Sequence, residues 1–459
     1  MASRPQNSKQ RNTKQPPAEA PTLRDPLTMF CYADLTGAIR GKGFPTRMLA
    51  KKLKSGVGWT PTNIMFTALG TIAPSPWGPH GDLSLMPDPA AKVDVDFGDG
   101  SPAERFFLCD LRNTDGSAWD CCPRSFLKNA VAALEKETGL HLMATFEQEF
   151  VYSGANERVG DMYALDAVRR HGNFGETFLG AVHEAGIEVD SYLSEFAGGQ
   201  FEVTMPPRDA LAACDSAIIV RELARGTAWR LGHKVTFSPR VTPDGLGSGV
   251  HIHFSLWDKK GKPVSYDPAR ERGVSEKAGQ FLAGVIEHMP ALCAFTAPTP
   301  VSYLRLKPHT WTGAWSNLGY RDREAGIRIC PTFGTGKDVV ARQFNFEYRA
   351  ADATANAYLQ LGMIIHAGLA GLKQRLPMPK PTQDQDPETM PEAERVKRKI
   401  RRLPGSTKEA FDALKVDKTV QAFLPERLLQ IYIAEHEAEF ALSEAWSPAE
   451  ICRRYAEVY

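Results

Sequence analysis

The sequence predicts an α+β protein in which a small N-terminal domain of strands precedes a larger domain that mixes strands and helices. Residues 27–44 read as strand, turn and strand, because glycines interrupt two short apolar stretches. Residues 124–138 predict a helix, with Pro123 at its start and Gly139 at its end. Beyond it, helical and strand patterns alternate, which is typical of helices packed on a sheet.

The small domain is predicted to span residues 25–115. After the first hairpin, apolar stretches predict three further strands, at residues 63–71, 92–97 and 105–111. Residues 1–24 are rich in Gln, Pro, Lys and Asn and show no periodicity. Such a segment cannot bury enough apolar surface to fold alone, so we expect a disordered tail there.

The larger domain is predicted to span residues 118–459. Ser406 and Glu409 form a capping box, which predicts the start of a helix. The Pro- and acid-rich residues 376–395 predict an exposed loop. Apolar periodicity predicts further helices at residues 161–172, 174–185, 209–231 and 425–446, which alternate in part with strands carrying Glu195, Glu202 and His251.

The composition excludes several classes of protein. The chain has 459 residues, of which 55 are basic and 54 acidic, so its charge gives no general attraction to nucleic acid or membrane. Its eight cysteines form no C-x-x-C pair, which indicates reduced thiols. There is no apolar signal core, and no apolar run reaches the roughly 18 residues of a spanning helix. We expect a cytoplasmic protein that binds neither nucleic acid nor membrane.

Acidic residues are grouped in a way that predicts a metal site. Glu147 and Glu149 lie two apart in an alternating apolar stretch, so both project from one face of a strand. Paired carboxylates repel each other, and a divalent cation is the usual means of holding them together, although a solvated strand face is the alternative for one such motif. Oxygen and imidazole ligands suit Mg²⁺ or Mn²⁺. Three further elements are of this kind: Glu195 with Glu202 around a Gly-Gly turn, His251 with His253, and Glu347.

The order of these motifs resembles the glutamine synthetase superfamily, and within it the branch that makes γ-glutamyl amides. The motifs read Glu-x-Glu, Glu-x6-Glu, Gly-Ser-Gly-x-His-x-His and Glu-x-Arg, at residues 147–149, 195–202, 247–253 and 347–349. The resemblance implies a β-grasp N-terminal domain and a glutamine-synthetase-type catalytic domain with an antiparallel sheet flanked by helices. It also implies two or more Mg²⁺ or Mn²⁺ ions, one held by Glu149, Glu195 and Glu202 and a second by Glu147, His251 and Glu347.

The resemblance implies an ATP-dependent ligase that works in two steps. ATP phosphorylates the side-chain carboxylate of glutamate to γ-glutamyl phosphate, and an amine then displaces phosphate. Because a carboxylate must approach an anionic triphosphate, cationic groups have to neutralise both. The residues at family positions are Arg323 and Arg328 for catalysis; His253, Ser255, Arg328 and Arg342 for the nucleotide; and Gly247, His251, Arg305, Arg323 and Arg349 for the substrate.

Two departures from the family pattern concern the second substrate. Ammonia-using members place an aspartate in the N-terminal domain to hold ammonium, but this chain has no Asp or Glu between Leu35 and Gly81. They also place a glutamate six residues after the carboxylate-gripping arginine, where this chain has Trp311. An indole offers an apolar or π surface in place of an anion. The departures therefore predict that the acceptor is not ammonium.

We expect an organic amine, of the aryl or alkyl class, as the acceptor. An arylamine is largely neutral near pH 7 and needs no buried base before attack. An alkylamine would need one, for which His309 and Glu324 are candidates, and a polyamine fits less well because each extra ammonium would seek an acid. The side chains expected to hold the amine are aromatic: Phe66, Trp311, Trp59, Trp77 and Trp315.

Two other functions stay open on the sequence alone. One is ordinary glutamine synthesis with a displaced ammonium site. The other is a non-catalytic homologue that acts as a sensor or structural subunit. Against it, all six predicted metal ligands and the series of arginines are present, whereas a decayed site would be free to lose them. The resemblance also implies a homo-oligomer of stacked hexameric rings, a dodecamer, with each active site between the small domain of one subunit and the large domain of the next.

Overall fold

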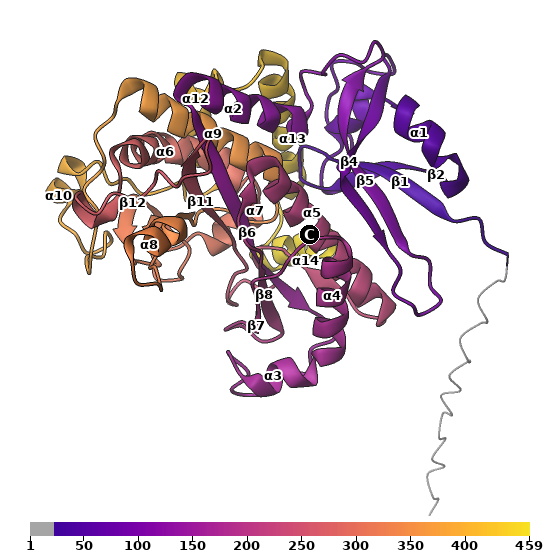
Figure 1. Ribbon diagram of the computed structural model, residues 1–459, viewed down its shortest axis with the longest axis horizontal. Coiled ribbons are helices and arrows are strands. Elements are labelled where there is room, and N and C mark those ends of the chain that lie inside the picture. The colour runs from indigo at the N-terminus through magenta and orange to yellow at the C-terminus, as the bar shows by residue number, and fades with distance from the viewer. Residues whose placement is uncertain (1–22) are drawn as a thin grey trace, which may run out of the picture.

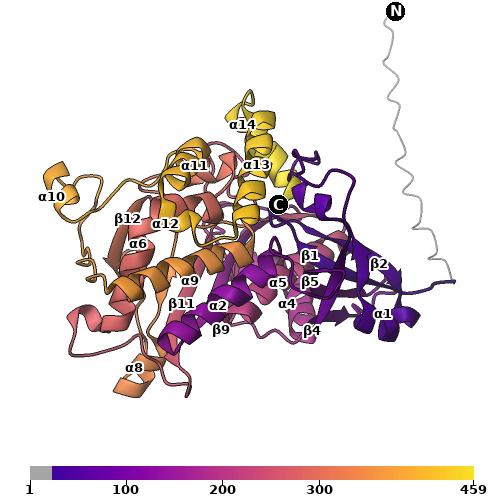
Figure 2. The ribbon, with the colours of Figure 1, turned by 90° about the horizontal axis from the view of Figure 1, so that it is seen from above.

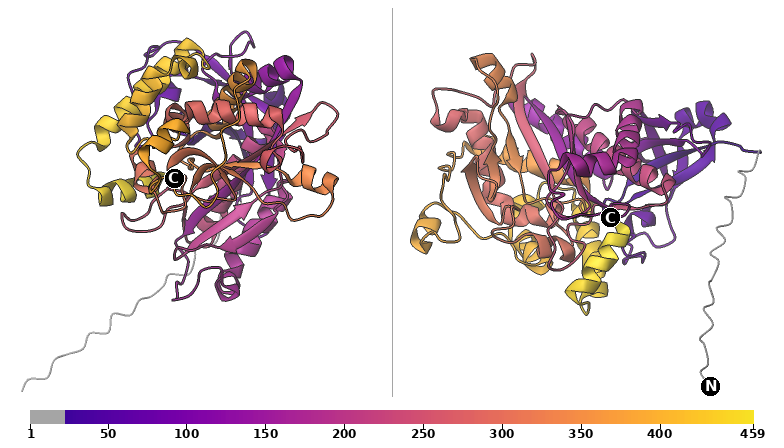
Figure 3. Two further views of the ribbon diagram at one scale, coloured as in Figure 1. Left: turned by 90° about the vertical axis from the view of Figure 1, so that its left-hand side faces the viewer. Right: turned by 90° about the horizontal axis from the view of Figure 1, so that it is seen from below.

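The computed structural model describes residues 23–459, and within them the strands form two sheets with helices packed around them (Figure 1). The small β domain lies at one end of the long axis, and the larger domain of sheet and flanking helices occupies the rest (Figures 1 and 3). This arrangement confirms the predicted α+β fold class. The expectation of a disordered tail at residues 1–24 falls, except for Leu23 and Arg24, outside the described residues.

The small sheet has the strand order β2-β1-β5-β4-β3, and its neighbours run antiparallel except for the parallel pair β1 and β5. The predicted strands at residues 27–44, 92–97 and 105–111 fall on or overlap elements of this sheet. Helix α1, Leu49–Ser55, packs beside it. The strand bounds are β1 Leu27–Ala33, β2 Ile39–Pro45, β3 Val57–Trp59, β4 Leu83–Val95 and β5 Glu104–Asn113.

The prediction of a strand at residues 63–71 is wrong. Pro61 stands in the first turn of a short 3-10 helix, Pro61–Met65. After it, the Thr67 hydroxyl accepts a hydrogen bond from the backbone N–H of Thr71 at 3.1 Å, and Gly70 has φ of +84°. The segment is therefore a 3-10 helix followed by a tight turn, and it presents the side chain of Phe66 next to Arg40.

The large sheet follows the order β12-β13-β14-β11-β6-β8-β7, and two short strands, β9 and β10, also pair with β6. Its described pairs are antiparallel, as predicted, except that β12 and β13 are parallel. The bounds are β6 Leu140–Tyr152, β7 Ser191–Ser194, β8 Gln200–Thr204, β9 Arg208–Asp209, β10 Val235–Thr236, β11 Val250–Asp258, β12 Trp315–Tyr320, β13 Ala325–Ile329 and β14 Phe346–Tyr348.

Long helices cover one side of this sheet, and Figure 2 shows α2 and α9 crossing it from above. Gly139 ends α2 with φ of +70°, as its predicted C-cap role requires. The predicted helix at residues 161–172 is shorter than expected, because Tyr163 has φ of +55° and α3 begins only at Leu165. The bounds are α2 Pro123–Thr138, α3 Leu165–Arg170, α4 Gly172–Glu184, α5 Ala210–Arg230, α6 Glu276–Thr296, α7 Pro300–Arg305, α8 Lys337–Gln343, α9 Ala357–Gln374, α10 Glu392–Lys397, α11 Thr407–Val416, α12 Lys418–Gln421, α13 Glu426–Ser443 and α14 Pro448–Val458.

Strand β6 shows why the site has one buried and one open side. Its even-numbered side chains, among them Leu142, Phe146 and Phe150, are buried, and α2 and α5 pack against this strand. Its odd-numbered side chains are half-buried and point to the opposite face. Glu147 and Glu149 are in that second set, so the helices support the strand from behind while both carboxylates remain accessible.

The C-terminal helices connect the two domains. Glu439 on α13 accepts a hydrogen bond from the backbone N–H of Ala68 at 2.9 Å, and the Tyr459 hydroxyl donates to the carbonyl of Thr36 at 3.0 Å. Figure 2 shows α13 and α14 alongside the small domain. The main hydrophobic core also includes residues of both domains. None of the helices in the described part of the chain combines the length and apolarity needed to cross a membrane.

Candidate active site

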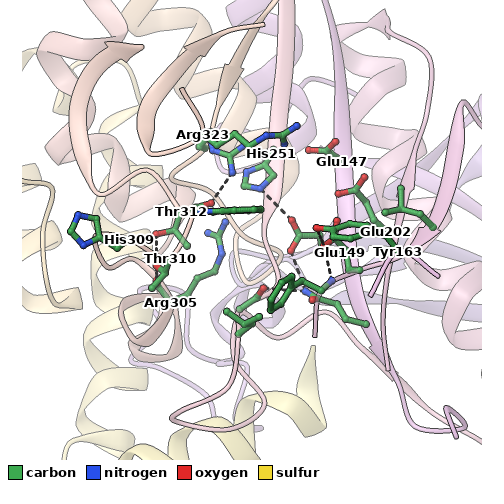
Figure 4. A pocket seen from close by; sticks show the side chains of 18 residues that line it. Glu147, Glu149, Tyr163, Glu202, His251, Arg305, His309, Thr310, Thr312 and Arg323 are labelled. Atoms are coloured by element: carbon green, nitrogen blue, oxygen red, sulfur yellow. Dashed lines mark hydrogen bonds and ion pairs between the residues drawn. The ribbon is translucent and has the colours of Figure 1, made fainter. Parts of the chain in front are cut away.

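The pairing of β6 with β11 gathers two carboxylates and two imidazoles on one face. His251 lies directly opposite Glu147 in the antiparallel register, and His253 lies two residues further along the same strand. Side chains at alternate positions share a face, so these residues lie together with Glu149. The Nε2 atom of His251 is 3.2 Å from a carboxylate oxygen of Glu149. A dashed line marks this contact in Figure 4.

Glu347 on β14 completes a first group of candidate metal ligands. It lies opposite His253 in the register of β11 and β14. Ligand atoms of Glu147, His253 and Glu347 all lie within 4.8 Å of one another. The Nδ1 atom of His253 donates a hydrogen bond to the side-chain oxygen of Asn345 at 2.9 Å, which leaves Nε2 for this group. The imidazole in the group is thus His253, whereas the family resemblance implies His251.

A second group of carboxylates lies beside the first. Glu202 on β8 is directly opposite Glu149 on β6. Glu195 follows β7, and its carboxylate accepts a hydrogen bond from the Tyr163 hydroxyl at 3.0 Å. Glu149 accepts one from the backbone N–H of Gly249 at 2.8 Å. Glu147, Glu149, Glu195 and Glu202 line one cavity of about 730 Å³.

The carboxylates of this cavity are electrostatically unequal. Burial, together with the charges of Glu147, Glu149 and Glu195, raises the pKa of Glu202 to about 10. Burial and the neighbouring Glu149 also raise the pKa of Glu195. By contrast, hydrogen bonding and attraction from His251, with help from Arg305, outweigh burial and lower the pKa of Glu149 to about 2. Four acids in one cavity with unbalanced charge are a donor set that fits divalent cations.

Arg305, on α7, lies under the glycine turn at residues 247–249 and is 2% exposed. A Cβ atom added at Gly247 would come within 2.6 Å of the Arg305 side chain, and one at Gly249 would also collide with it. One Arg305 nitrogen donates to the carbonyl of Ala351 at 3.0 Å. Glycine is therefore required here so that a buried guanidinium can pass beneath the turn and reach the cavity.

Arg328 and Arg349 hold Glu347 from both sides. An Arg328 nitrogen is 3.0 Å from one carboxylate oxygen, and Arg349 pairs with the other. The attraction of Arg349 and His253 outweighs burial and holds the pKa of Glu347 well below its usual range. Arg349 also donates to the carbonyl of Trp311 at 2.7 Å. Glu347 is thereby fixed as an ionised carboxylate at the base of the site.

The predicted site residues do not all reach the cavity. Its wall includes Gly247, His251, Arg305, Arg323, Arg349 and Trp311 together with the four acids. Ser255 is buried and accepts a hydrogen bond from the indole of Trp257 at 2.8 Å. Arg342 is exposed on α8, and Phe66 lies in the small domain with the guanidinium of Arg40 4.9 Å from its ring centre. Neither these three residues nor Arg328 contribute to the cavity wall.

Family comparisons give this geometry a context. The glutamine synthetase catalytic-domain family matches residues 120–454, and the glutamine synthetase N-terminal-domain family matches residues 18–119. The chain belongs to the glutamine synthetase family. This family membership confirms the resemblance seen in the motifs and identifies the chain as a ligase of that family.

The chain is similar over most of its length to named members of the glutamine synthetase family. It is 32% identical over 417 residues to a γ-glutamylpolyamine synthetase, GlnA3, of Streptomyces coelicolor, and the match covers 88% of each chain. It is 30% identical over 382 residues to a type-1 glutamine synthetase of Dictyostelium discoideum, covering 77% of this chain and 75% of that one. Family members are ATP-dependent, amide-forming ligases that use divalent metal ions.

Solved structures of the family superpose well on this one. A crystal structure described as a novel glutamine synthase homolog has a TM-score of 0.88 and 38% identity, covering 96% of this chain and 100% of that one. A complex of GmaS with ADP has a TM-score of 0.77 and 25% identity, covering 92% and 94%. The large sheet and the small domain of this glutamine synthetase family member are thus the shared scaffold.

The loop after α7 is the part of this family member that departs most clearly from the expected motif. His309, Thr310, Trp311 and Thr312 line the cavity. Figure 4 shows His309, Thr310 and Thr312 on the side opposite Glu147, Glu149 and Glu202. His309 and Trp311 have φ of +59° and +58°. Left-handed backbone costs a non-glycine residue about 1 kcal/mol or more, so other contacts must hold the loop. Trp311 remains 58% exposed at the cavity mouth.

The remaining tryptophans considered for the acceptor lie elsewhere. Trp315 is buried in a small cluster with Met390 and Ile400. Trp59 packs edge-on against Tyr32, and Trp77 packs against Trp119. None of the three contributes to the cavity wall. Of the aromatic residues named from the sequence, only Trp311 lines the cavity that this chain forms by itself.

Sequence reasoning missed several residues that line the cavity. Three large apolar side chains at its wall, Tyr163, Phe196 and Leu246, are 55%, 47% and 41% exposed. They come from three separate loops. Phe196 and Leu246 stand next to Glu195 and Gly247 in the sequence, but no local pattern indicated that their side chains would line the cavity. Gln200 had a signal, because it lies between Glu195 and Glu202. Its side-chain nitrogen donates to the carbonyl of Gly247 at 3.0 Å and so ties the glycine turn to the acids.

Proposed function

We propose that this ligase joins the γ-carboxylate of glutamate to an organic amine, of the aryl or alkyl class, at the expense of ATP. The observation that carries the proposal is the composition of the cavity. Its lining has four carboxylates, and it also has the exposed apolar side chains of Trp311, Tyr163, Phe196 and Leu246. The first suits a metal-dependent transfer between anions, and the second suits an acceptor with an apolar body.

The carboxylates are the proposed ligands of the divalent ions. Glu149, Glu195 and Glu202 form one set, and Glu147, Glu347 and an imidazole form the other. The proximity of His253 to Glu147 and Glu347 supports it as a ligand alongside the expected His251. Bound Mg²⁺ or Mn²⁺ would neutralise the carboxylates and the triphosphate. Burial and neighbouring carboxylates raise the pKa values of Glu195 and Glu202, and neither acid forms an ion pair with a described residue. Bound cations would supply the missing positive charge, which supports this assignment.

The arginines have the proposed task of orienting the anionic substrates. Arg305 and Arg349 would bind glutamate, because a guanidinium holds a carboxylate through two N–H groups. Arg323 is exposed at the cavity wall and would face the phosphate being transferred, with Arg328 behind it. His253, Ser255 and Arg342 remain the proposed nucleotide contacts, although they lie outside this cavity.

The acceptor is proposed to enter at the Trp311 side. An arylamine would stack or pack on the indole and attack without first losing a proton. Glu324 is not a suitable base, because both its carboxylate oxygens accept backbone N–H groups, at 3.0 Å from His309 and 2.6 Å from Trp311. The ring of His309 is 2.9 Å from Asp386. Because Glu324 and His309 are both held by these contacts, the described residues of the site offer no obvious base to take a proton from an ammonium group. This favours an amine that arrives uncharged.

A polyamine is the second candidate, favoured by the name of the Streptomyces relative. The cavity gives it less support. Within the described residues, the carboxylates of the cavity wall are the four acids assigned above to metal ions. A second ammonium group at the mouth would therefore find no further acid in this chain's own wall. Glutamine synthesis and a non-catalytic role are the remaining alternatives.

The proposed assembly is a ring in which neighbouring subunits complete each other's sites. Phe66 lies in the small domain and does not contribute to the cavity wall of its own subunit. Its position beside Arg40 on the small domain is compatible with contact to a neighbouring copy. This supports Phe66 as a proposed acceptor contact across a subunit interface in a homo-oligomer.

The test is phosphate release in the presence of ATP, Mg²⁺ and glutamate, with a panel of acceptors. The panel contains ammonium, n-butylamine, ethanolamine, putrescine and aniline at equal concentration. We expect at least one of n-butylamine and aniline to exceed ammonium clearly. Turnover with ammonium equal to or faster than with every organic amine would refute the proposal. Putrescine as the fastest acceptor would establish the second candidate instead.

A further inference from the structure

The loop between α7 and β12 is held by a carboxylate from outside it. Glu324 stands in the turn between β12 and β13, directly before the first residue of β13. One of its oxygens accepts the backbone N–H of Trp311 at 2.6 Å, and the other accepts the backbone N–H of His309 at 3.0 Å. These are the two non-glycine residues of the loop with left-handed backbone, at φ of +58° and +59°. The carboxylate thus binds the loop where its conformation is least favourable.

The turn that carries Glu324 is itself fixed. The backbone N–H of Glu324 donates to the Asp322 side chain at 2.9 Å. The neighbouring Arg323 lines the cavity, whereas Glu324 does not. Its carboxylate therefore lies behind the loop and supports it, without access to a substrate in the cavity. A charged acceptor that receives two N–H donors makes stronger hydrogen bonds than a neutral one.

Trp311 is held on its other side by the acid cluster. Its carbonyl accepts a hydrogen bond from Arg349 at 2.7 Å, and the same guanidinium pairs with Glu347. The backbone of Trp311 is thereby clamped between Glu324 and the base of the active site. Its indole, which makes no hydrogen bond to any described residue, projects 58% exposed at the cavity mouth.

We propose that Glu324 is a positioning residue that holds Trp311 at the acceptor side of the cavity and so sets the affinity for the amine. The inference rests on the proposed function for the identity of the acceptor. The clamp itself is a property of the loop and does not depend on the proposed function. Two independent readouts therefore test the clamp and the role in acceptor binding separately.

The first readout is amide hydrogen exchange in the loop, measured by mass spectrometry on the full-length protein without substrates. Glu324→Ala removes both acceptors, so exchange in peptides covering residues 307–313 should accelerate by about tenfold or more. Glu324→Gln keeps one side-chain oxygen and should give an intermediate rate. The matched control is Glu271→Ala, because Glu271 is exposed and its side chain makes no hydrogen bond or ion pair with a described residue. Unchanged exchange in Glu324→Ala would overturn the clamp.

The second readout is the pattern of Michaelis constants with the fastest acceptor of the panel, ammonium included. Glu324→Ala should raise KM for that acceptor by about fivefold or more while KM for glutamate and for ATP changes by less than about twofold. Glu324→Gln should recover part of the loss. An equal rise in all three constants, or no rise for the acceptor, would overturn the assignment to acceptor binding. If ammonium proves the fastest acceptor, the proposed function fails, but the exchange and the KM pattern still decide the role of Glu324.

Discussion

Single side chains do more than one job in this site, and Glu347 is the clearest example. It is 1% exposed and pairs with Arg328 and Arg349. Its carboxylate also lies within 4.8 Å of ligand atoms of Glu147 and His253. An ionised carboxylate with so little exposure is stable only with such partners. The same residue thus organises the arginines proposed for the substrates and the imidazole proposed for a metal.

Glu147 offers the sharper mutational test, because it is a proposed ligand with fewer structural partners. We expect Glu147→Ala to lower turnover with every amine by more than about a hundredfold, since changes even to groups that only orient ligands cost 10–100-fold. The measurement is phosphate release with ATP, Mg²⁺ and glutamate. Wild-type-like turnover in Glu147→Ala would remove the second metal from the account, and Glu271→Ala serves as its folded control.

At the scale of elements, helix α13 carries a buried acidic group that no substrate reaches. Glu435, His436 and Glu439 are each at most 1% exposed. Glu439 accepts hydrogen bonds from the Tyr455 hydroxyl at 2.7 Å and from the backbone N–H of Ala68 at 2.9 Å. Burial, and then the charge of Glu435, raises the pKa of Glu439 to about 7. The contact between α13 and the small domain should therefore depend on pH.

The sign of that dependence follows from proton binding. The folded state holds the Glu439 proton up to about pH 7, whereas an unfolded glutamate releases it near pH 4.5. The stabilisation is complete below the unfolded pKa and is lost as pH rises through the folded one. We expect the melting temperature to fall between about pH 5 and 8. Glu439→Gln, which mimics the protonated acid, should flatten this fall, and an equally steep fall in the variant would contradict the assignment.

Elements were predictable where a local rule decided them. The alternation of β6 correctly predicted one face for Glu147 and Glu149, and Gly139 ended its helix as expected. The strand predicted after Pro61 was wrong, because a 3-10 helix and a turn fixed by the Thr67 side chain and a glycine determine this segment, not apolar alternation. The choice between His251 and His253 could not be made from spacing, since both share a face. The register of β11 against β14 sets His253 opposite Glu347. These residues are about a hundred apart in sequence, so no local pattern predicts that they meet.

The cavity was predictable only in part for the same reason. The four acids, Arg305 and Trp311 stand in motifs, and the structure brings them around one cavity. Tyr163, Phe196 and Leu246 come from separate loops and required the fold to be known. Trp315 shows the converse, because its residue type suggested an acceptor contact while the chain buries it against Met390 and Ile400. Residue type alone does not tell which side of a loop a ring will take.

At the scale of the whole molecule, a scaffold shared with solved structures of the glutamine synthetase family carries the cavity in which the amine is proposed to bind. The two domains share one hydrophobic core, so the small domain is a fixed part of the chain. The carboxylates of the cavity wall fit the family's metal-dependent chemistry. The same cavity is also lined by the indole of Trp311 and by the exposed side chains of Tyr163, Phe196 and Leu246. We propose that these exposed apolar side chains select an organic amine over ammonium.

The most direct test is a competition in a single reaction. The wild-type protein is given ATP, Mg²⁺ and glutamate with equimolar ammonium, n-butylamine and aniline, and the products are quantified by mass spectrometry. We expect a γ-glutamyl amide of one of the two organic amines to exceed glutamine, because the apolar side chains that line the cavity lower the free energy of binding for an apolar acceptor. Glutamine as the main product would contradict it.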